Sequence, residues 1–400
     1  MRLQVFTIVL AALAGPADAQ AVQAAGPNVV IGDIDDLSGV YADGTGAGAI
    51  EAMKMAIADF GGVVLGRKIV TQIADHQNKP DIGASKAREW ADVDGLNMLL
   101  GGANTGVSIA LAKIAAAKKV PFFVIGAGGA SLTNEDCTAY TVQYVYNTTA
   151  LANGTASVVL AAGGKSWFYL TADYAFGTQL QTAASKVVEA GGGKNVGAVR
   201  VPLSAADFSS FLLQAQASGA KVLGFANAGE DFTNSLKAAN EFGINRTMMP
   251  AGLLVTIRNI NSLGLSLTQG LYLTTAWYWD TNDETRAFAR RFFDKFRKQP
   301  TMYQAGYYSA TLTYLKSVAA AGSTDADKVM AELRKTKVND MFTKGGYVRA
   351  DGVMVHDMYV MQVKSPSQSK YPWDYYKVVK VVPGEQVFGP ITGLCPLAPK

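Results

Sequence analysis

Short apolar runs alternate with longer amphipathic segments along most of the chain. The runs are rich in β-branched and aromatic residues and predict strands at Val29–Ile34, Ile69–Ala74, Leu96–Leu100, Phe122–Ile125, Trp167–Thr171, Val196–Val201, Val222–Ala226 and Leu271–Ala276. The segments between them predict helices at Ala47–Asp59, Ile82–Ala91, Ser108–Ala117, Gly154–Ala162, Gln179–Ala190, Phe208–Ala217 and Thr233–Phe242. Strands that alternate with helices are typical of parallel sheets with right-handed crossovers. The continuously apolar run at 120–125 indicates a sheet covered by helices on both faces, so the pattern predicts an α/β protein.

The alternation pauses once, in the polar stretch Tyr146–Thr149, and then restarts. After the strand near 271–276 come three helical blocks, at 285–297, 305–321 and 326–335, and a strand-rich tail from Tyr359 to Val382. Thr281 and Glu284 have the spacing of a capping box and predict the start of the first block. We find no internal repeat and no low-complexity linker, which favours two doubly wound parallel-sheet lobes that share crossing segments.

The first residues have the layout of a secretory signal peptide. Arg2 supplies a positive start, Leu3 to Leu13 an apolar run, and Ala17-Asp18-Ala19 a cleavage site before Gln20. We therefore expect residues 1–19 to be removed, with an uncleaved amphipathic start as the alternative. No later run has the roughly 18 apolar residues of a membrane span, so we expect the mature chain to be soluble in the periplasm.

Charge and cysteine content narrow the classes of partner. The net charge of +4 is small for 400 residues, and the chain has no long basic run, which disfavours nucleic acid and anionic membranes as partners. In an oxidising compartment the two cysteines, Cys137 and Cys395, either form one disulfide or remain two separate buried thiols. The sequence alone leaves both possibilities open.

Three turns in the first half have the composition of an anion cradle. Ligands of open parallel sheets bind beyond the carboxyl ends of the strands, where helix N-termini present N–H groups. The turns Leu37–Gly44, Gly101–Gly106 and Gly126–Ser131 combine glycines with a small hydroxyl or amide side chain. Such groups hold a carboxylate without a full positive charge, although ordinary helix capping is the better explanation of any one turn taken alone. Three of them together favour a carboxylate site.

The second half offers aromatic rings and amides at its strand ends. They lie in the segments Ala172–Gly177, Asn227–Asp231 and Trp277–Trp279. Rings at such ends are predicted to cover the apolar body of a ligand, and packing at the lobe edge is the alternative.

Catalytic constellations are missing from the sequence. The glycine-rich segment 44–49 lacks the tight turn of a dinucleotide fingerprint, although Asp75 ends the second strand as a ribose-binding acid would. There is no phosphate-binding loop, no nucleophile elbow and no zinc-protease motif. The two histidines, His76 and His356, are too far apart in sequence for a histidine-rich metal site. We interpret the acidic run at 33–36 as solvated carboxylates rather than a cation site, and we expect no cofactor and no enzymatic activity.

Five segments carry a resemblance through their order and spacing: Ile31–Gly44, Leu99–Ala112, Phe122–Thr133, Thr171–Gly177 and Gln304–Ala310. Through them the mature chain resembles the branched-chain amino-acid (Leu/Ile/Val) class of solute-binding proteins of ABC importers. The tail segments His356–Tyr359 and Ser369–Tyr376 are similar to a subgroup with members that bind aromatic acids or other solutes that are not amino acids.

This resemblance implies a type I periplasmic binding fold, in which two lobes close over the ligand. The implied crossings lie near Tyr146–Thr149, Thr275–Trp279 and Asp351–His356. The implied lobes are residues 28–147 plus 277–354, the N-terminal lobe, and residues 148–276 plus 355–400, the C-terminal lobe, with the ligand cleft between them.

The resemblance also implies a set of ligand-binding residues. Thr105 matches the carboxylate-binding hydroxyl, and Phe176 matches the aromatic residue of the second lobe. Together with the strand-end residues, the expected ligand-binding set is Tyr41, Asn104, Thr105, Ala127, Gly128, Gly129, Tyr174, Phe176, Asn227 and Trp277.

Two departures from the family pattern bear on the ligand. Asn147 stands where the family often has Asp, and Gly128-Gly129 replaces a hydroxyl that holds the ammonium of an amino acid. A buried ammonium without a partner is costly, and Glu230 or Asp231 could supply the acidic partner. We therefore expect a monomeric binding protein that delivers an aromatic or apolar carboxylate, with an amino acid as second choice, to the permease subunits of an ABC transporter. The alternative is a sensor that presents its solute to a receptor.

Overall fold

The computed structural model describes residues 27–398, so the predicted signal peptide lies outside the described residues. The first lobe is built on a six-stranded sheet of order β2-β3-β1-β4-β5-β6, parallel except for the β2–β3 pair. Its strands are β1 (Val29–Asp35), β2 (Val63–Val64), β3 (Arg67–Asp75), β4 (Leu96–Gly101), β5 (Phe122–Val124) and β6 (Thr141–Gln143). Its helices are α1 (Ala42–Thr45), α2 (Ala47–Phe60), α3 (Pro80–Glu89), α4 (Thr105–Lys118), α11 (Asp283–Phe296), α12 (Met302–Ala321) and α13 (Ala326–Lys335).

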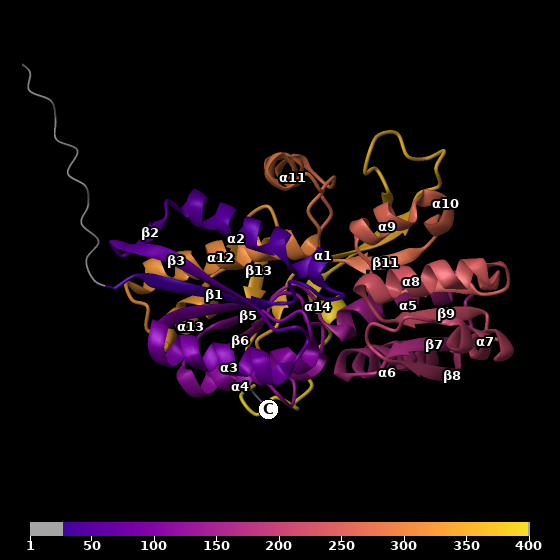
Figure 1. The fold of residues 1–400 in the computed structure, drawn as a ribbon, viewed down its shortest axis with the longest axis horizontal. Coiled ribbons are helices and arrows are strands. Elements are labelled where there is room, and N and C mark those ends of the chain that lie inside the picture. Colours follow the sequence, from indigo (N-terminus) through magenta and orange to yellow (C-terminus); the bar gives the residue numbers. More distant parts are fainter. Residues whose placement is uncertain (1–26, 399–400) are drawn as a thin grey trace, which may run out of the picture.

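The second lobe is built on a seven-stranded sheet of order β16-β15-β11-β10-β9-β7-β8, with β15 and β16 antiparallel at one edge. Its strands are β7 (Ser166–Ala172), β8 (Lys194–Val201), β9 (Val222–Ala226), β10 (Met249–Gly252), β11 (Tyr272–Thr275), β15 (Met358–Val363) and β16 (Tyr376–Val382). Its helices are α5 (Thr148–Ala161), α6 (Ala175–Ala190), α7 (Ser209–Ala217), α8 (Gly229–Glu241), α9 (Ile257–Leu263), α10 (Leu265–Thr268) and α14 (Gly384–Phe388). The two lobes lie side by side along the long axis of the molecule (Figure 1).

The chain passes between the lobes after β6, after β11 and after a small sheet formed by β12 (Val338–Asn339), β13 (Lys344–Val348) and β14 (Met354–Val355). The three predicted crossing segments lie at these passages. At the first of them Asn147 caps α5, its Oδ1 accepting a hydrogen bond from the Ala150 N–H at 2.8 Å. The polar stretch Tyr146–Thr149 therefore marks the start of helix α5. The residue limits of the lobes stay a prediction.

The predicted α/β fold is confirmed, and every predicted strand overlaps an observed one. All seven residues of β1 are buried, as expected for a central strand with helices on both faces. The sequence reasoning missed short elements such as β6, β10, α9 and α14, in which too few residues repeat for a period to be seen. The predicted capping box was wrong by one residue, because Asn282 and Thr285 bond to each other's main-chain N–H at the start of α11.

The acidic run at the end of β1 corrects a second expectation. Asp33, Asp35 and Asp36 are fully buried rather than solvated. The Asp35 carboxylate accepts a hydrogen bond from the Ala103 N–H at 2.9 Å, and Asp36 accepts from the N–H groups of Gly39 and Tyr41. Burial raises the pKa of both Asp33 and Asp35. Asp36 therefore holds the loop after β1 in place, and Asp35 ties the end of β1 to the loop after β4.

Candidate functional site

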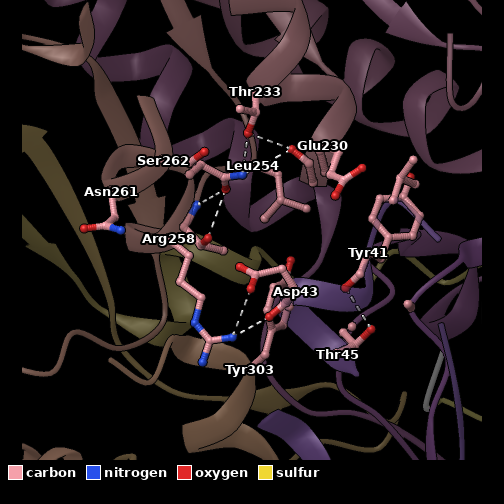
Figure 2. A pocket seen from close by; sticks show the side chains of 18 of the residues that line it. Tyr41, Asp43, Thr45, Glu230, Thr233, Leu254, Arg258, Asn261, Ser262 and Tyr303 are labelled. Atoms are coloured by element: carbon pink, nitrogen blue, oxygen red, sulfur yellow. Dashed lines mark hydrogen bonds and ion pairs between the residues drawn. The ribbon is translucent and has the colours of Figure 1, made fainter. Parts of the chain in front are cut away.

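A cavity of about 640 Å³ lies between the lobes, and both contribute to its wall (Figure 2). This volume is in the range of small-molecule sites. The wall residues from the first lobe are Val40, Tyr41, Asp43, Gly44, Thr45, Ala103, Gly126, Tyr146, Arg297, Lys298 and Tyr303. Those from the second lobe are Tyr174, Phe176, Ala228, Gly229, Glu230, Thr233, Asn234, Leu254, Thr256, Arg258, Asn259, Asn261, Ser262 and Trp373.

Four tyrosines of this wall are joined in pairs through their hydroxyl groups. Tyr41 and Tyr174 come from different lobes, and their phenolic oxygens lie 2.5 Å apart. Tyr146 donates to the Gly126 carbonyl oxygen at 2.5 Å, and its own oxygen lies 3.2 Å from that of Tyr303. Burial raises the pKa of each hydroxyl, that of Tyr303 to about 12, so all four are neutral at physiological pH. The wall therefore presents neutral hydrogen-bonding groups.

Arg258 supplies a buried positive charge to the wall. It belongs to α9 of the second lobe but bonds to first-lobe carbonyl oxygens: Nε donates to Gln299 at 3.1 Å, and Nη1 donates to Asp43. The Asp43 carboxylate lies 3.8 Å from Nη1, and the guanidinium carbon lies 5.2 Å from the centre of the Phe296 ring. Burial lowers the Arg258 pKa to about 10, so it keeps its charge at neutral pH. Arg258 thus joins the two lobes at the cavity.

Tyr41, Tyr174 and Phe176 of the predicted site line the cavity. The Tyr174 and Phe176 rings lie 6.0 Å apart and form an aromatic wall in the second lobe. Glu230, considered in the sequence analysis as an ammonium partner, also lines the cavity but is exposed. Asp231 does not line it; its carboxylate accepts from the Ser204 N–H at 3.1 Å.

The predicted carboxylate cradle forms the wall only in part: its turns contribute Val40, Tyr41, Asp43, Gly44, Ala103 and Gly126, whereas Asn104, Thr105 and residues 127–129 lie behind the wall. Asn104 caps α4 by accepting from the N–H groups of Gly106 and Val107. Thr105 is fully buried, and its Oγ1 accepts from the Gly129 N–H at 3.1 Å. The carbonyl oxygens of Ala127 and Gly129 accept from the Gln143 amide, and that of Gly128 accepts from the Thr148 N–H. These polar groups already bond to one another.

Steric crowding explains why Gly128 and Gly129 carry no side chain. A Cβ atom on Gly128 would lie 2.7 Å from a Tyr146 ring carbon and 3.0 Å from one of Phe176. One on Gly129 would lie 2.2 Å from the Thr105 methyl group. The absent side chain of Gly128 therefore lets a ring from each lobe reach this turn, and that of Gly129 makes room for Thr105.

Asn227 and Trp277, also predicted to bind ligand, do not line the cavity. The Asn227 amide donates to the Asp231 carbonyl oxygen and to the Ser235 hydroxyl. The Trp277 indole donates to the Met341 carbonyl oxygen at 3.0 Å and packs edge-on against Phe288 of α11. Its strand end meets first-lobe elements instead of opening onto the cavity, and so the expectation for Trp277 is corrected to packing between the lobes.

Sequence reasoning missed Thr45, Tyr146, Arg258 and Tyr303. Arg258 lies in a segment for which no element was predicted, and Tyr303 lies just before a predicted helical block. Only Tyr146 carried a signal, its position at the first crossing. The others reach the cavity through tertiary folding.

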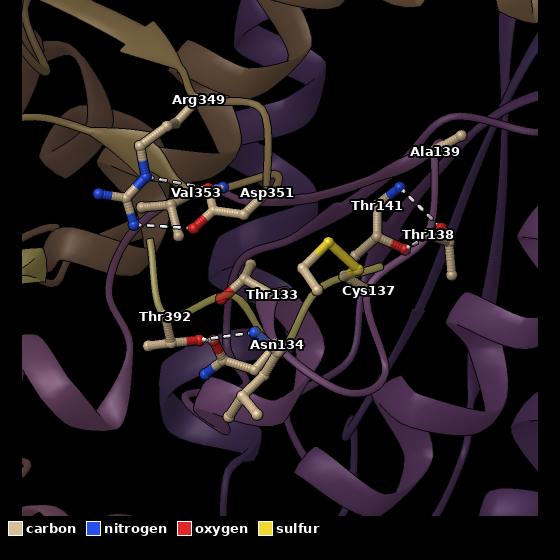
Figure 3. Close-up of a disulfide and its surroundings, with 12 residues drawn as sticks. Thr133, Asn134, Cys137, Thr138, Ala139, Thr141, Arg349, Asp351, Val353 and Thr392 are labelled. Atoms are coloured by element: carbon tan, nitrogen blue, oxygen red, sulfur yellow. Dashed lines mark hydrogen bonds and ion pairs between the residues drawn. A yellow bond between two sulfur atoms is a disulfide. The ribbon is translucent and has the colours of Figure 1, made fainter. Parts of the chain in front are cut away.

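Cys137 and Cys395 form a disulfide in the structure (Figure 3). Beside it, the Thr392 hydroxyl donates to the Asn134 side-chain oxygen at 2.6 Å. The end of the chain, assigned in the sequence analysis to the C-terminal lobe, therefore returns to the first lobe and is covalently tied there.

Within residues 27–398, no helix is long and apolar enough to cross a membrane. Nor does that part of the chain hold a group of three or more His, Cys, Asp or Glu side chains arranged to bind a metal ion.

Comparison with known proteins places this geometry in a family. The model of the family described as "Periplasmic binding protein" matches residues 28–370. A periplasmic binding protein from Burkholderia mallei is 57% identical, with a TM-score of 0.91 over 92% of this chain and 99% of that one. A branched chain amino acid ABC transporter periplasmic ligand-binding protein from Burkholderia xenovorans is 40% identical, with a TM-score of 0.81 over 91% of this chain and 97% of that one.

A more distant relative is the Leu/Ile/Val-binding protein homolog 6 of Brucella melitensis, 26% identical over 64% of this chain and 67% of its own length. The family match covers most of the chain, and the two solved Burkholderia structures share its fold. The chain therefore belongs to the periplasmic binding protein family.

Proposed function

We propose that the protein is the extracytoplasmic substrate-binding component of an ABC importer and captures a small carboxylate-bearing solute by hinge closure. The observation that supports this best is the cavity between the lobes, which both lobes line and beside which direct hydrogen bonds join one lobe to the other. A solute that contacts both walls stabilises the closed form, because binding shifts the equilibrium toward the state it fits better.

Neutral donors of the wall would hold the carboxylate. Gly126 lines the cavity, and its main-chain N–H has no protein acceptor within residues 27–398. Tyr146 and Tyr303 lie beside it with hydroxyl groups that can reorient toward an anion. The buried charge of Arg258 adds a positive potential that favours an anionic solute.

The rest of the wall suits an apolar or aromatic body better than an ammonium group. Phe176, Tyr174 and Leu254 supply apolar surface, whereas Glu230, the one acidic wall residue outside the Arg258 contact, is exposed. An ammonium shielded from water needs a buried acidic partner. We therefore rank aromatic and apolar carboxylates first and α-amino acids second.

Calorimetry and thermal-shift assays test this proposal. The panel is benzoate, 4-hydroxybenzoate, short aliphatic acids, L-leucine and the matching neutral amides. We expect the acids to raise the melting temperature and the amides to leave it unchanged. A response confined to α-amino acids would overturn the ranking, and a response to no carboxylate would overturn the proposal.

Export to the periplasm and recognition by permease subunits complete the proposal. The predicted leader at residues 1–19 and the family membership support this location. The leader is tested by fusing the chain to a reporter enzyme that is active only outside the cytoplasm, with and without the segment from Arg2 to Leu13.

We infer that the solute is delivered unchanged, and recovery of a chemically altered solute from the purified protein would contradict this.

A further inference from the structure

The loop between β15 and β16, residues 364–375, reaches the cavity through Trp373. Aromatic and charged residues crowd this loop, and no step of the proposed capture uses them yet. Trp373 is half-buried, and its ring lies 5.7 Å from that of Tyr375. The Tyr375 hydroxyl in turn donates to Asn261, another wall residue, at 2.8 Å.

The backbone of Trp373 is in the left-handed region, with φ 69°. Glycine or asparagine adopts this conformation readily, whereas a bulky residue there is a genuine outlier that costs free energy. Residues with such a strained backbone are found most often at functional sites such as ligand clamps, and they occur only where the surrounding structure fixes the conformation.

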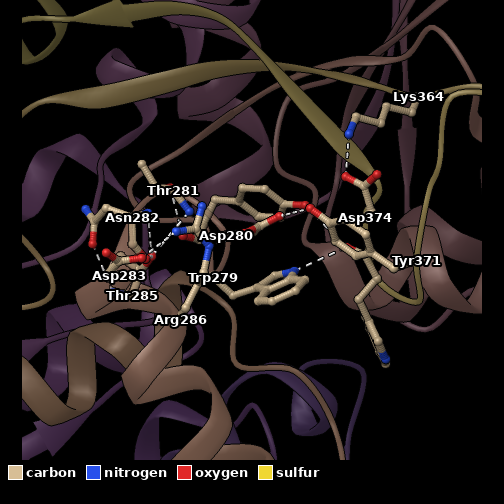
Figure 4. Close-up of polar contacts among 12 residues, drawn as sticks. Trp279, Asp280, Thr281, Asn282, Asp283, Thr285, Arg286, Lys364, Tyr371 and Asp374 are labelled. Carbon is tan, nitrogen blue, oxygen red and sulfur yellow. Dashed lines mark hydrogen bonds and ion pairs between the residues drawn. The ribbon is translucent and has the colours of Figure 1, made fainter.

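Trp373 is held firmly. Its carbonyl oxygen accepts hydrogen bonds from the Tyr278 hydroxyl at 3.2 Å and from the Trp279 indole at 3.1 Å. The next residue, Asp374, is buried and bonds to the Lys364 ammonium and to the Lys370 N–H. Tyr371 donates to Asp280 at 2.5 Å, so the loop is fixed to the segment that follows β11 (Figure 4).

None of these bonds uses the Trp373 side chain. A glycine at this position would keep both bonds to the carbonyl oxygen and would relieve the backbone. The indole must therefore be explained by what it touches, which is the edge of the second-lobe core on one side and the cavity on the other.

We propose that Trp373 determines specificity: its indole covers the flat end of the solute at the outer wall of the cavity. The inference rests on the proposed function and names the solute class more closely, as a carboxylate with a planar body. Stacking on an indole favours such bodies over short polar acids.

Variants of Trp373 test this with 4-hydroxybenzoate and L-leucine as probes. Trp373→Gly fits the left-handed backbone, and we expect an unchanged or higher melting temperature with about tenfold weaker binding of 4-hydroxybenzoate. Trp373→Phe keeps a ring and should bind within about threefold of the wild type. Lys119→Gly is the matched control, because Lys119 is also left-handed, with φ 53°, and does not line the cavity.

The outcomes separate the two proposals. If Trp373→Gly binds the probe as tightly as the wild type does, the inference about Trp373 is wrong and the proposed function stands. If the wild type binds L-leucine but not 4-hydroxybenzoate, the inferred class is wrong. If the wild type binds no acid in the whole panel, both the inference and the proposed function are wrong. Should Trp373→Gly fail to fold, Trp373→Asn replaces it, since asparagine tolerates the same backbone.

Discussion

The phenolic oxygens of Tyr41 and Tyr174 lie 2.5 Å apart although the two residues belong to different lobes. Tyr41 follows β1 and Tyr174 follows β7, so the bond joins the carboxyl ends of one strand from each sheet. Nearby, the Glu230 N–H donates to the Val40 carbonyl oxygen at 3.1 Å. The structure is thus closed at this part of the cavity, and lobe opening must break these bonds.

Removal of either hydroxyl should favour the open form. We expect Tyr41→Phe and Tyr174→Phe each to weaken solute binding by roughly threefold to tenfold, the equivalent of one hydrogen bond. Because both substitutions remove the same bond, the double variant should bind almost as well as each single one. Calorimetry on the four proteins measures this, and additive losses would show that the two hydroxyls act separately.

Arg258→Met should loosen closure without loss of stability. The guanidinium bonds to carbonyl oxygens of the other lobe, so we expect its removal to shift the unliganded protein toward open forms. The substitution also removes the desolvation cost of a buried charge. This gain offsets the loss of the hydrogen bonds, so we expect the free energy of unfolding to stay the same. X-ray scattering and chemical denaturation separate the two effects. Arg297→Met, at an exposed wall position, is the control, and an equal expansion in both variants would contradict the role of Arg258.

Thr105 was predicted to bind the carboxylate directly, but in the structure it does not line the cavity. Its Oγ1 is the acceptor for the Gly129 N–H, and the residue is fully buried. Thr105→Ala leaves that N–H without its partner, which should cost about 1–3 kcal/mol of stability and weaken binding through displacement of the glycine turn. Thr105→Ser keeps the acceptor and should restore both. A loss of affinity in Thr105→Ala without any loss of stability would favour direct contact after all.

The sequence was a good guide to periodic features and a poor one to individual cavity residues. Strands such as β5 and β9 are continuously apolar, and this pattern does not depend on the tertiary arrangement. Tyr41, Tyr174 and Phe176 were found because they follow strands, and topology brings the carboxyl ends of parallel strands to the cleft. Arg258 and Tyr303 reach the cavity only because α9 and α12 pack beside it, and no local pattern carries that information. Thr105 and Gly129 satisfy each other, and a sequence does not reveal which polar groups are already paired.

The disulfide should contribute to stability as well as to the path of the chain. It closes a loop with a sequence separation of 258 residues, and loss of a native disulfide typically costs about 2–5 kcal/mol. We expect the Cys137→Ser/Cys395→Ser protein to unfold at a lower denaturant concentration than the wild type. A reducing agent should destabilise the wild type and leave the double variant unaffected. If the reducing agent affected both proteins equally, the disulfide would not stabilise the folded protein.

His76 should make the protein sensitive to mild acid. The ring is buried, its Nδ1 accepts from the Asn78 N–H at 2.9 Å, and its Nε2 has no partner among the described residues. Burial lowers the His76 pKa from 6.5 to about 4. Between these values the unfolded chain binds the proton and the folded protein does not, so stability falls as the pH drops through 6.5 toward 4. From pH 7.5 to 5 we expect this residue to account for a loss of about 2 kcal/mol.

His76→Asn isolates that contribution. The asparagine oxygen can accept from the Asn78 N–H in place of Nδ1, but the side chain does not titrate. The other buried acids, Asp33 and Asp35, are the same in both proteins, so their effects cancel in the difference. Denaturation at pH 7.5 and pH 5 should therefore show the wild type losing about 2 kcal/mol more than the variant. Parallel losses in the two proteins would mean that His76 is protonated equally easily in the folded and unfolded states.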